Sequence, residues 1–288
     1  YGDWSSDVCS SDLKQRRRIT LYVTIVAIAF VVIPFLFWRG TWFGRPLPDA
    51  DLEQYLNDTS QPRHIQHALV QISERIERGD RGAERWYPRV AELATSPVTE
   101  LRVTLAFVLG SDSKSELFHN ALLKLVADPD VLVRRNAALS LVRFNDAAGL
   151  DVIRPMFQAT VVKANAAGTV RYRAQMDSGV EGGTVVARIE QGAGTSVNVT
   201  TPVPGKVLEL KRPEGSEVSE GDELLVLSPG EMHVWEGLRA LTVIGSAEDL
   251  ELLTQFERFG SADLPERYRQ QAQIAIEEIH KRGEAVRP

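Results

Sequence analysis

Residues Pro204 to Leu227 read PGKVLELKRPEGSEVSEGDELLVL, and this stretch indicates how the middle of the chain folds. Short runs of alternating apolar residues are separated by turns that contain glycine, which is the pattern of short antiparallel strands. An earlier stretch, residues 167–189, repeats the same order of glycine, strand, turn, glycine and strand. The repetition predicts an all-β domain at residues 159–230 that consists of two similar halves.

The glycines recur at corresponding turns of the two halves. Tight turns between short, strongly curved strands need a positive φ or a close approach of the backbone, and glycine permits both at little cost. We therefore predict structural turn glycines at six positions. These are Gly168, Gly179, Gly183, Gly205, Gly215 and Gly221.

Residues 204–227 resemble the biotinyl/lipoyl domain family, in which a glycine and an apolar strand precede the pattern Glu-Gly-x-x-Val-x-x-Gly-x-x-Leu. The resemblance implies a barrel-sandwich hybrid fold. In carrier members of the family, a lysine in the turn between the halves receives biotin or lipoate. The corresponding turn here is 190–195, and alignment with the family places Ala193 or Gly194 at the lysine position. Neither residue has an amine, so the resemblance implies a domain without a cofactor.

Cofactor-free relatives of this family are the hemolysin-D-type membrane fusion proteins, which are periplasmic adaptors of efflux and secretion systems. The similarity implies a transporter or an outer-membrane channel as a protein partner. Typical adaptors carry an α-helical hairpin between the two halves, whereas here the short glycine turn 190–195 joins them. The similarity therefore does not extend to the hairpin that reaches the channel.

A helical repeat precedes the β-domain. From about residue 63, apolar residues recur every three or four positions, as in amphipathic helices. Residues 96–102 (SPVTELR) match residues 128–134 (DPDVLVR), with their prolines 32 positions apart. A repeat of this length is typical of stacked helical hairpins. In both segments a Ser or Asp can cap a helix, and the proline suits a position that needs no N–H.

Residues 128–141 resemble the HEAT-repeat family, whose helices often start with Asp-Pro followed by Val-Arg and an Ala/Leu-rich face. The resemblance implies a protein-binding α-solenoid at 63–158 that continues at 231–282, so that the β-domain interrupts it. Arg134 and Arg135 leave two interpretations open. Arginine at this position usually braces the neighbouring repeat, and it can also bind a peptide or an anion.

The N-terminal part predicts a membrane anchor. Residues 19–38 are uncharged and apolar, and about 20 helical residues cross the hydrocarbon core of a bilayer. Basic residues precede them and aromatic residues follow, which places the N-terminus in the cytoplasm and the bulk of the chain in the periplasm, at the inner membrane. A cleaved signal peptide is the alternative, but its apolar core has about 7–15 residues.

Two flanking segments have no predicted fold. Residues 1–13 contain DVCSSDL, which resembles the translation of a sequencing-adapter oligonucleotide, and we treat them as a non-native leader. Residues 44–62 are rich in proline and aspartate, so we predict a linker.

The sequence offers little for chemistry. Cys9 is the only cysteine, which excludes an intrachain disulfide and a cysteine-based metal site. The net charge of -6 and the lack of a recurring basic face argue against a nucleic-acid partner. His64 and His67 lie three positions apart, but no third metal ligand is placed with them. We predict no catalytic residue, no metal site and no cofactor.

These observations predict a multidomain α plus β protein: a transmembrane helix, HEAT-like repeats and an inserted β-domain. Its predicted function is that of a non-enzymatic, membrane-anchored adaptor or scaffold for a transport or envelope complex. The alternative is a carrier or small-ligand module on the β-domain. A third possibility is a sensor, but the predicted cytoplasmic part is too short for an output domain.

Overall fold

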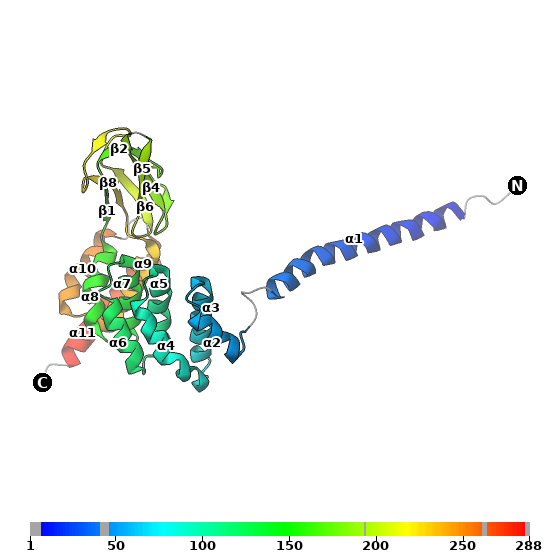
Figure 1. Ribbon diagram of the computed structural model, residues 1–288, viewed down its shortest axis with the longest axis horizontal. Helices are drawn as coiled ribbons and strands as arrows, with labels where there is room; N and C mark the ends of the chain where they lie inside the picture. The colour runs from blue at the N-terminus through cyan, green and yellow to red at the C-terminus, as the bar shows by residue number, and fades with distance from the viewer. Residues whose placement is uncertain (1–6, 41–45, 193, 261–263, 286–288) are drawn as a thin grey trace. The chain divides into compact units, whose positions relative to one another are not determined.

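The computed structural model describes residues 7–40, 46–192, 194–260 and 264–285 (Figure 1), and for 7–19, 37–40, 259 and 260 the backbone alone. The chain forms two compact units, Tyr1–Tyr55 and Leu56–Pro288. The first contains α1 (Asp7–Gly40) and most of α2 (Asp49–Asn57). Of the predicted leader, residues 1–6 lie outside the described residues, and 7–13 belong to α1.

Helix α1 changes the prediction for the N-terminal part. In the described part of the chain, no helix has the length and apolar character required to cross a membrane. The transmembrane helix predicted at 19–38 is therefore contradicted. The single-pass inner-membrane location predicted with it is contradicted as well.

Helices of the second unit lie on both sides of the strands in the sequence. The α-helices are α3 (Pro62–Glu77), α4 (Tyr87–Glu92), α5 (Thr99–Val108), α6 (Glu116–Leu125), α7 (Val131–Val142), α8 (Leu150–Ile153), α9 (Glu231–Ile244), α10 (Leu250–Gln255) and α11 (Glu266–Ala285). The 3-10 turns are η1 (Arg81–Trp86), η2 (Leu93–Thr95), η3 (Leu109–Ser111), η4 (Ala147–Gly149), η5 (Arg154–Phe157) and η6 (Ala247–Asp249), and η7 (Phe256–Gly260) is a π-helical turn.

The helices form a stack of hairpins. Helix α5 packs between α3 and α7, α7 also packs against α9, and α9 packs against α11. Polar side chains of α7 donate hydrogen bonds to carbonyls of the preceding hairpin: Asn136 to Val103 at 3.1 Å and Ser140 to Ala106 at 2.7 Å. Since α7 touches α9 although the strands separate them in the sequence, the β-domain is inserted into a continuous stack.

The two matching proline segments precede helices, but the proline and the N-cap residue stand at other positions than the sequence predicts. Pro97 and Pro129 each lie one residue before the N-cap, because α5 begins after Val98 and α7 begins after Asp130. The first residue of each motif is therefore no N-cap. Asp128, at that position in the second motif, is buried and accepts two hydrogen bonds from Arg102, at 2.6 and 3.1 Å.

Eight strands form the β-domain: β1 (Thr160–Lys163), β2 (Gly168–Tyr172), β3 (Gly179–Val180), β4 (Val185–Gly192), β5 (Thr195–Thr200), β6 (Gly205–Leu210), β7 (Glu217–Val218) and β8 (Glu223–Leu227). They make two antiparallel four-stranded sheets, ordered β1-β8-β6-β3 and β5-β4-β2-β7. Exchanging each strand of the first half with its counterpart in the second converts one order into the other. The internal repeat of the sequence is therefore also a repeat of the topology.

The base of the β-domain joins it to the helices. Strands β1 and β8 pair antiparallel, with Thr160 opposite Leu227, so the entering and leaving chains lie side by side (Figure 1). Below them Phe157 packs so closely on Gly237 that a Cβ at the glycine would lie 2.9 Å from the ring. Adjacent ends of this kind allow a domain to be inserted without disturbing its host.

Candidate functional site

The turn at 190–195, predicted to correspond to the lysine turn of carrier domains, belongs to the β4–β5 hairpin. Gly192 and Gly194 both have a positive φ, of 87° and 78°. Ala193, the other residue predicted at the lysine position, lies outside the described residues. The described residues of the turn thus offer no amine to which biotin or lipoate could be attached.

The predicted turn glycines divide into three kinds. A Cβ at Gly168 would lie 2.3 Å from the carbonyl oxygen of Glu190, and one at Gly205 would lie 2.3 Å from that of Ser228. These two glycines stand at equivalent positions of the two halves and permit the same close approach of neighbouring strands. Positive φ values occur at Gly183, Gly215 and Gly221, and also at Gly168 with 148°, whereas Gly179 has neither feature.

The histidines do not assemble into a metal site. His64 bonds to Asp58 at 2.7 Å, and His67 bonds to Gln71 at 3.0 Å on its own helix. Across the described residues, no three His, Cys, Asp or Glu side chains are close enough together to hold a metal ion.

A different set of residues, not singled out by the sequence, forms the most developed surface site. Asp80, Asp112 and Asp146 follow the first helices of three successive hairpins. Each carboxylate accepts a hydrogen bond from the backbone N–H two residues later, at 2.8, 2.9 and 2.8 Å. This local bond turns the chain toward the second helix of the hairpin. The spacings of 32 and 34 residues are the signal by which they could have been found.

Two of these aspartates also receive a side chain from the preceding hairpin. The Tyr87 hydroxyl donates to Asp112 at 2.9 Å, and His119 Nε2 bonds to Asp146 at 2.6 Å. Tyr87 and His119 are 32 positions apart, so the two bridges are repeats of one another. They tie each loop to its neighbour and hold the loop ends in a row.

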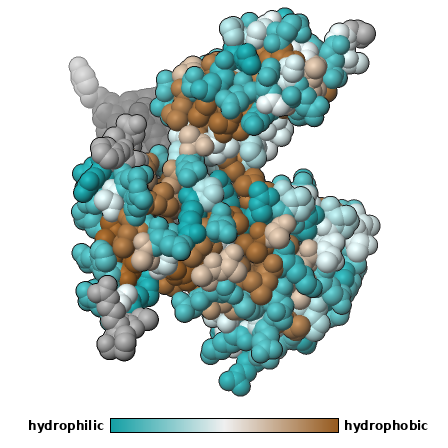
Figure 2. Space-filling view, turned by 90° about the vertical axis from the view of Figure 1, so that its left-hand side faces the viewer, coloured by the Kyte–Doolittle hydropathy of each residue, from teal (hydrophilic) through white to brown (hydrophobic). Residues whose placement is uncertain are grey.

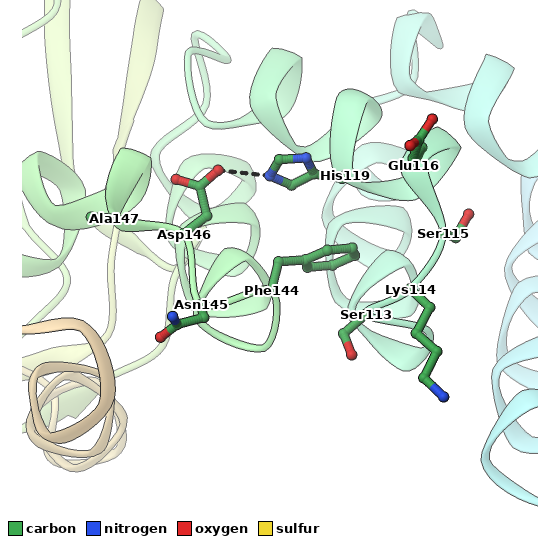
Figure 3. A pocket seen from close by; sticks show the side chains of 9 residues that line it. All are labelled: Ser113, Lys114, Ser115, Glu116, His119, Phe144, Asn145, Asp146 and Ala147. Atoms are coloured by element: carbon green, nitrogen blue, oxygen red, sulfur yellow. Dashed lines mark hydrogen bonds and ion pairs between the residues drawn. The ribbon is translucent and has the colours of Figure 1, made fainter.

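Two hollows lie between these loops. The larger, of about 790 Å³, separates the loop after α3 from the loop after α5, and its walls include Asp80, Glu84 and Asp112. The smaller, of about 400 Å³, lies between the loop after α5 and the loop after α7 (Figure 3). Both are lined by Lys114, Ser115 and Glu116, so they adjoin. We call the pair the loop groove.

The loop groove is acidic. Its walls carry the carboxylates of five residues and the cations of two, Lys114 and Arg81, with His119 in addition. The five acidic residues are Asp80, Glu84, Asp112, Glu116 and Asp146. The pKa of the Asp146 carboxyl is lowered, first by the hydrogen bond from Ala148 N–H and then by His119, against the opposing effect of burial. Burial and the bond to Asp112 raise the pKa of Tyr87 well above its usual value.

The His119–Asp146 pair has the polar contact of a catalytic dyad but lacks a bonded nucleophile. His119 Nε2 is the atom that contacts the carboxylate, and its ring stacks on Phe144 with 5.1 Å between centroids. Ser115 accepts a hydrogen bond from Phe118 N–H and makes none to His119. Figure 3 shows Ser113 and Ser115 pointing away from the imidazole. The pair therefore acts as a structural bridge in this geometry.

The surface of the helical stack is mixed in character. Figure 2 shows apolar patches among hydrophilic side chains on one face of the molecule. Large apolar side chains at least two-fifths exposed include Val70, Phe107, Leu117 and Val243. Leu117 lines the larger hollow, so the loop groove offers apolar contact as well as charge.

No protein-family model and no curated protein matches the chain. A solved structure titled "Structure and function of a single-chain, multi-domain long-chain acyl-coa carboxylase" shows a likeness at 20% sequence identity and a TM-score of 0.24. The likeness covers 35% of this chain, and it spans 10% of that one. A likeness this weak carries no argument about fold or function.

Proposed function

We propose that this protein is a non-enzymatic scaffold that binds a partner protein through its HEAT-like helical hairpins and carries a biotinyl/lipoyl-like β-domain without a prosthetic group. The supporting observation is the loop groove, whose two adjoining hollows lie between the loops that follow the first helices of three successive hairpins. A row of equivalent sites suits a partner that lies across the repeats as an extended segment.

The charges of the loop groove favour a basic segment. Glu84 and Glu116 are exposed at equivalent positions, 32 residues apart, and neither forms an ion pair with another described residue. Packed helices lie about 8–10 Å apart. A partner segment in the polyproline II conformation advances about 3.1 Å per residue with three residues per turn, so residues i and i+3 lie on one face and span one repeat. The partner is therefore a segment with Lys or Arg at positions i and i+3.

A peptide titration on the full chain tests this function. Two fluorescent ten-residue peptides of the same composition are compared by anisotropy, one with lysines at i and i+3 and one with lysines at i and i+1. The first should bind more tightly, and binding should weaken as salt rises, because exposed charges are screened. Equal binding of the two peptides would leave nonspecific attraction and refute a spaced site.

Variants locate the binding. Glu84→Gln and Glu116→Gln together should weaken the spaced peptide by about 2- to 30-fold, since each exposed charge pair contributes about 0.2–1 kcal/mol. Glu220→Gln is the matched control, because Glu220 is an exposed acid in the turn between β7 and β8. Equal losses in the double variant and the control would place the binding outside the loop groove.

The carrier function is the second candidate, and the resemblance to the biotinyl/lipoyl family is what favours testing it. Avidin and anti-lipoate blots of the full chain, purified from a host that modifies known carrier domains, decide between the two. The scaffold function predicts no signal in either blot. A signal, followed by mass spectrometry of the modified peptide, would identify an acceptor lysine and replace the proposal.

A further inference from the structure

Arg135 is a buried cation that has no counterion among the described residues. Its residue is 6% exposed, and it lies in the second turn of α7. No described carboxylate forms an ion pair with it, and the charged group that acts on it most is another cation, Arg134. A buried charge that lacks a partner is strongly unfavourable, so such a site is expected to take an opposite charge.

The other arginines of the stack show what bracing looks like. Arg134 donates to the carbonyl oxygens of Asp128 and Pro129 at 2.7 and 2.8 Å, and Arg143 donates to that of Gly110 at 3.1 Å. Arg134 thus bonds the turn before its own helix, whereas Arg143 braces the preceding hairpin. Arg135 makes a single long contact, from Nη1 to Nδ1 of His233 at 3.4 Å.

His233 brings Arg135 to the start of α9. It is the third residue of this helix, and its Nδ1 lies 3.3 Å from where a Cβ on Gly230 would stand. Burial, followed by the charge of Arg135, lowers the pKa of His233 to about 4, so at pH 7 its imidazole is neutral. The neutral ring accepts the Arg135 hydrogen bond and contributes no counter-charge.

The first turn of α9 adds a second positive end. Its N-cap is Gly230, which has no side chain to accept the free N–H groups of the turn. The acid of that turn, Glu231, is exposed and forms no ion pair with Arg135. A helix of 14 residues carries about half a positive charge at such an end and offers N–H donors to an oxyanion.

The β-domain borders this position. A Cβ on Gly182 would lie 3.1 Å from Leu132 in the first turn of α7, and one on Gly230 would lie 3.0 Å from the carbonyl oxygen of Pro204. Thr201 and Val203, in the segment that leads to Pro204, are buried. Arg135 thus lies where α7, the start of α9 and the β5–β6 segment meet.

We infer that Arg135 and the first turn of α9 bind a small oxyanion, either inorganic phosphate or the phosphate group of a small phosphomonoester, at the junction of the helical stack and the β-domain. The planar guanidinium supplies forked donors to two phosphate oxygens, and the N–H groups of α9 supply donors to another. His233 gains a proton more readily once the anion is present.

Thermal unfolding of the full chain tests the site, with sodium phosphate exchanged for sodium chloride at constant ionic strength and pH 7. Phosphate should raise the unfolding midpoint of the wild type, and should not raise that of Arg135→Met. Arg239→Met is the matched control, since Arg239 is an exposed arginine of α9, and it should respond as the wild type does. Glycerol 3-phosphate in place of phosphate distinguishes a free ion from a phosphomonoester.

A second readout on the wild type does not depend on how the variant folds. Nuclear magnetic resonance of the histidine ring should show the pKa of His233 rising from about 4 when phosphate is added, because the anion favours the imidazolium. Two outcomes overturn the inference: no response of the midpoint and of His233 to either phosphate compound, or a response of Arg135→Met that equals that of the wild type.

Discussion

Replacing Asp128 by asparagine should destabilise the helical stack by about 3 kcal/mol. The Asp128 side chain is 6% exposed and that of Arg102 is 12% exposed, so the substitution leaves a nearly buried guanidinium without its carboxylate. Breaking a buried ion pair from one side costs about 3–5 kcal/mol, and we take the lower end because Arg102 also donates to Ser96 O at 2.8 Å. At about 2–4 °C per kcal/mol for a unit of this size, the midpoint temperature of thermal unfolding should fall by about 6–12 °C.

Urea unfolding followed by circular dichroism at 222 nm measures the change, because most of the helical signal comes from this stack. Asp151→Asn is the control, as the Asp151 side chain is 94% exposed and its substitution should change the unfolding free energy by about 0.5 kcal/mol or less. The reasoning is refuted if Asp128→Asn changes the unfolding free energy by no more than Asp151→Asn does.

Three further predictions follow from other contacts. Burial raises the pKa of Asp128, but the hydrogen bonds from Arg102 and from Asp130 N–H outweigh it, so the pKa is lowered. The stabilisation by this carboxylate is full above the unfolded-state pKa of 3.8 and is lost as pH falls through the lowered pKa. The difference in unfolding free energy between wild type and Asp128→Asn should therefore become smaller in acid. Gly205→Ala should destabilise the β-domain by more than about 1 kcal/mol in chemical denaturation, because the new Cβ would meet Ser228 O, whereas Gly179→Ala, with open space, should stay near zero. Tyr87→Phe should lower the unfolding free energy by about 1 kcal/mol, because it removes the hydrogen bond to Asp112. The hydroxyl of Tyr268 makes no hydrogen bond with another described residue, so Tyr268→Phe should lower it by less in the same assay.

The β-strands were predictable because their determinants are local. Gly168 and Gly205 are the first residues of strands with alternating residues, and both the glycine and the alternation are visible in a single sequence. The exchange of strands between the two sheets follows from the repeat. The prediction from the proline motifs was less accurate, because α5 starts after Val98, and Ser96 accepts a hydrogen bond from Val98 N–H instead of capping the helix.

The loop groove was not predictable by motif because its parts are ordinary. Asp80, Asp112 and Asp146 are a residue type common in loops, and only the stacking of hairpins brings them into a row. The role of Arg135 was not predictable either, because it is the same residue type as its neighbour Arg134. What distinguishes the two is the set of acceptors within reach, and that set depends on helices far away along the chain.

The N-terminal prediction rested on the apolar character of residues 19–38 taken alone. Composition identifies a stretch that suits a bilayer, but whether the chain forms a helix able to cross one is a separate property of the structure. No helix in the part of the chain that the structure describes combines the length and the apolar character of a membrane span, so the prediction was wrong.

The central claim, that the ends of successive hairpins form one binding groove, is tested most directly by hydrogen exchange on the full chain with and without the spaced basic peptide. We predict slower exchange in residues 79–84, 111–117 and 144–147, which line the loop groove, and unchanged exchange in the β-domain. Slower exchange in the β-domain with no change in these three segments would contradict the account.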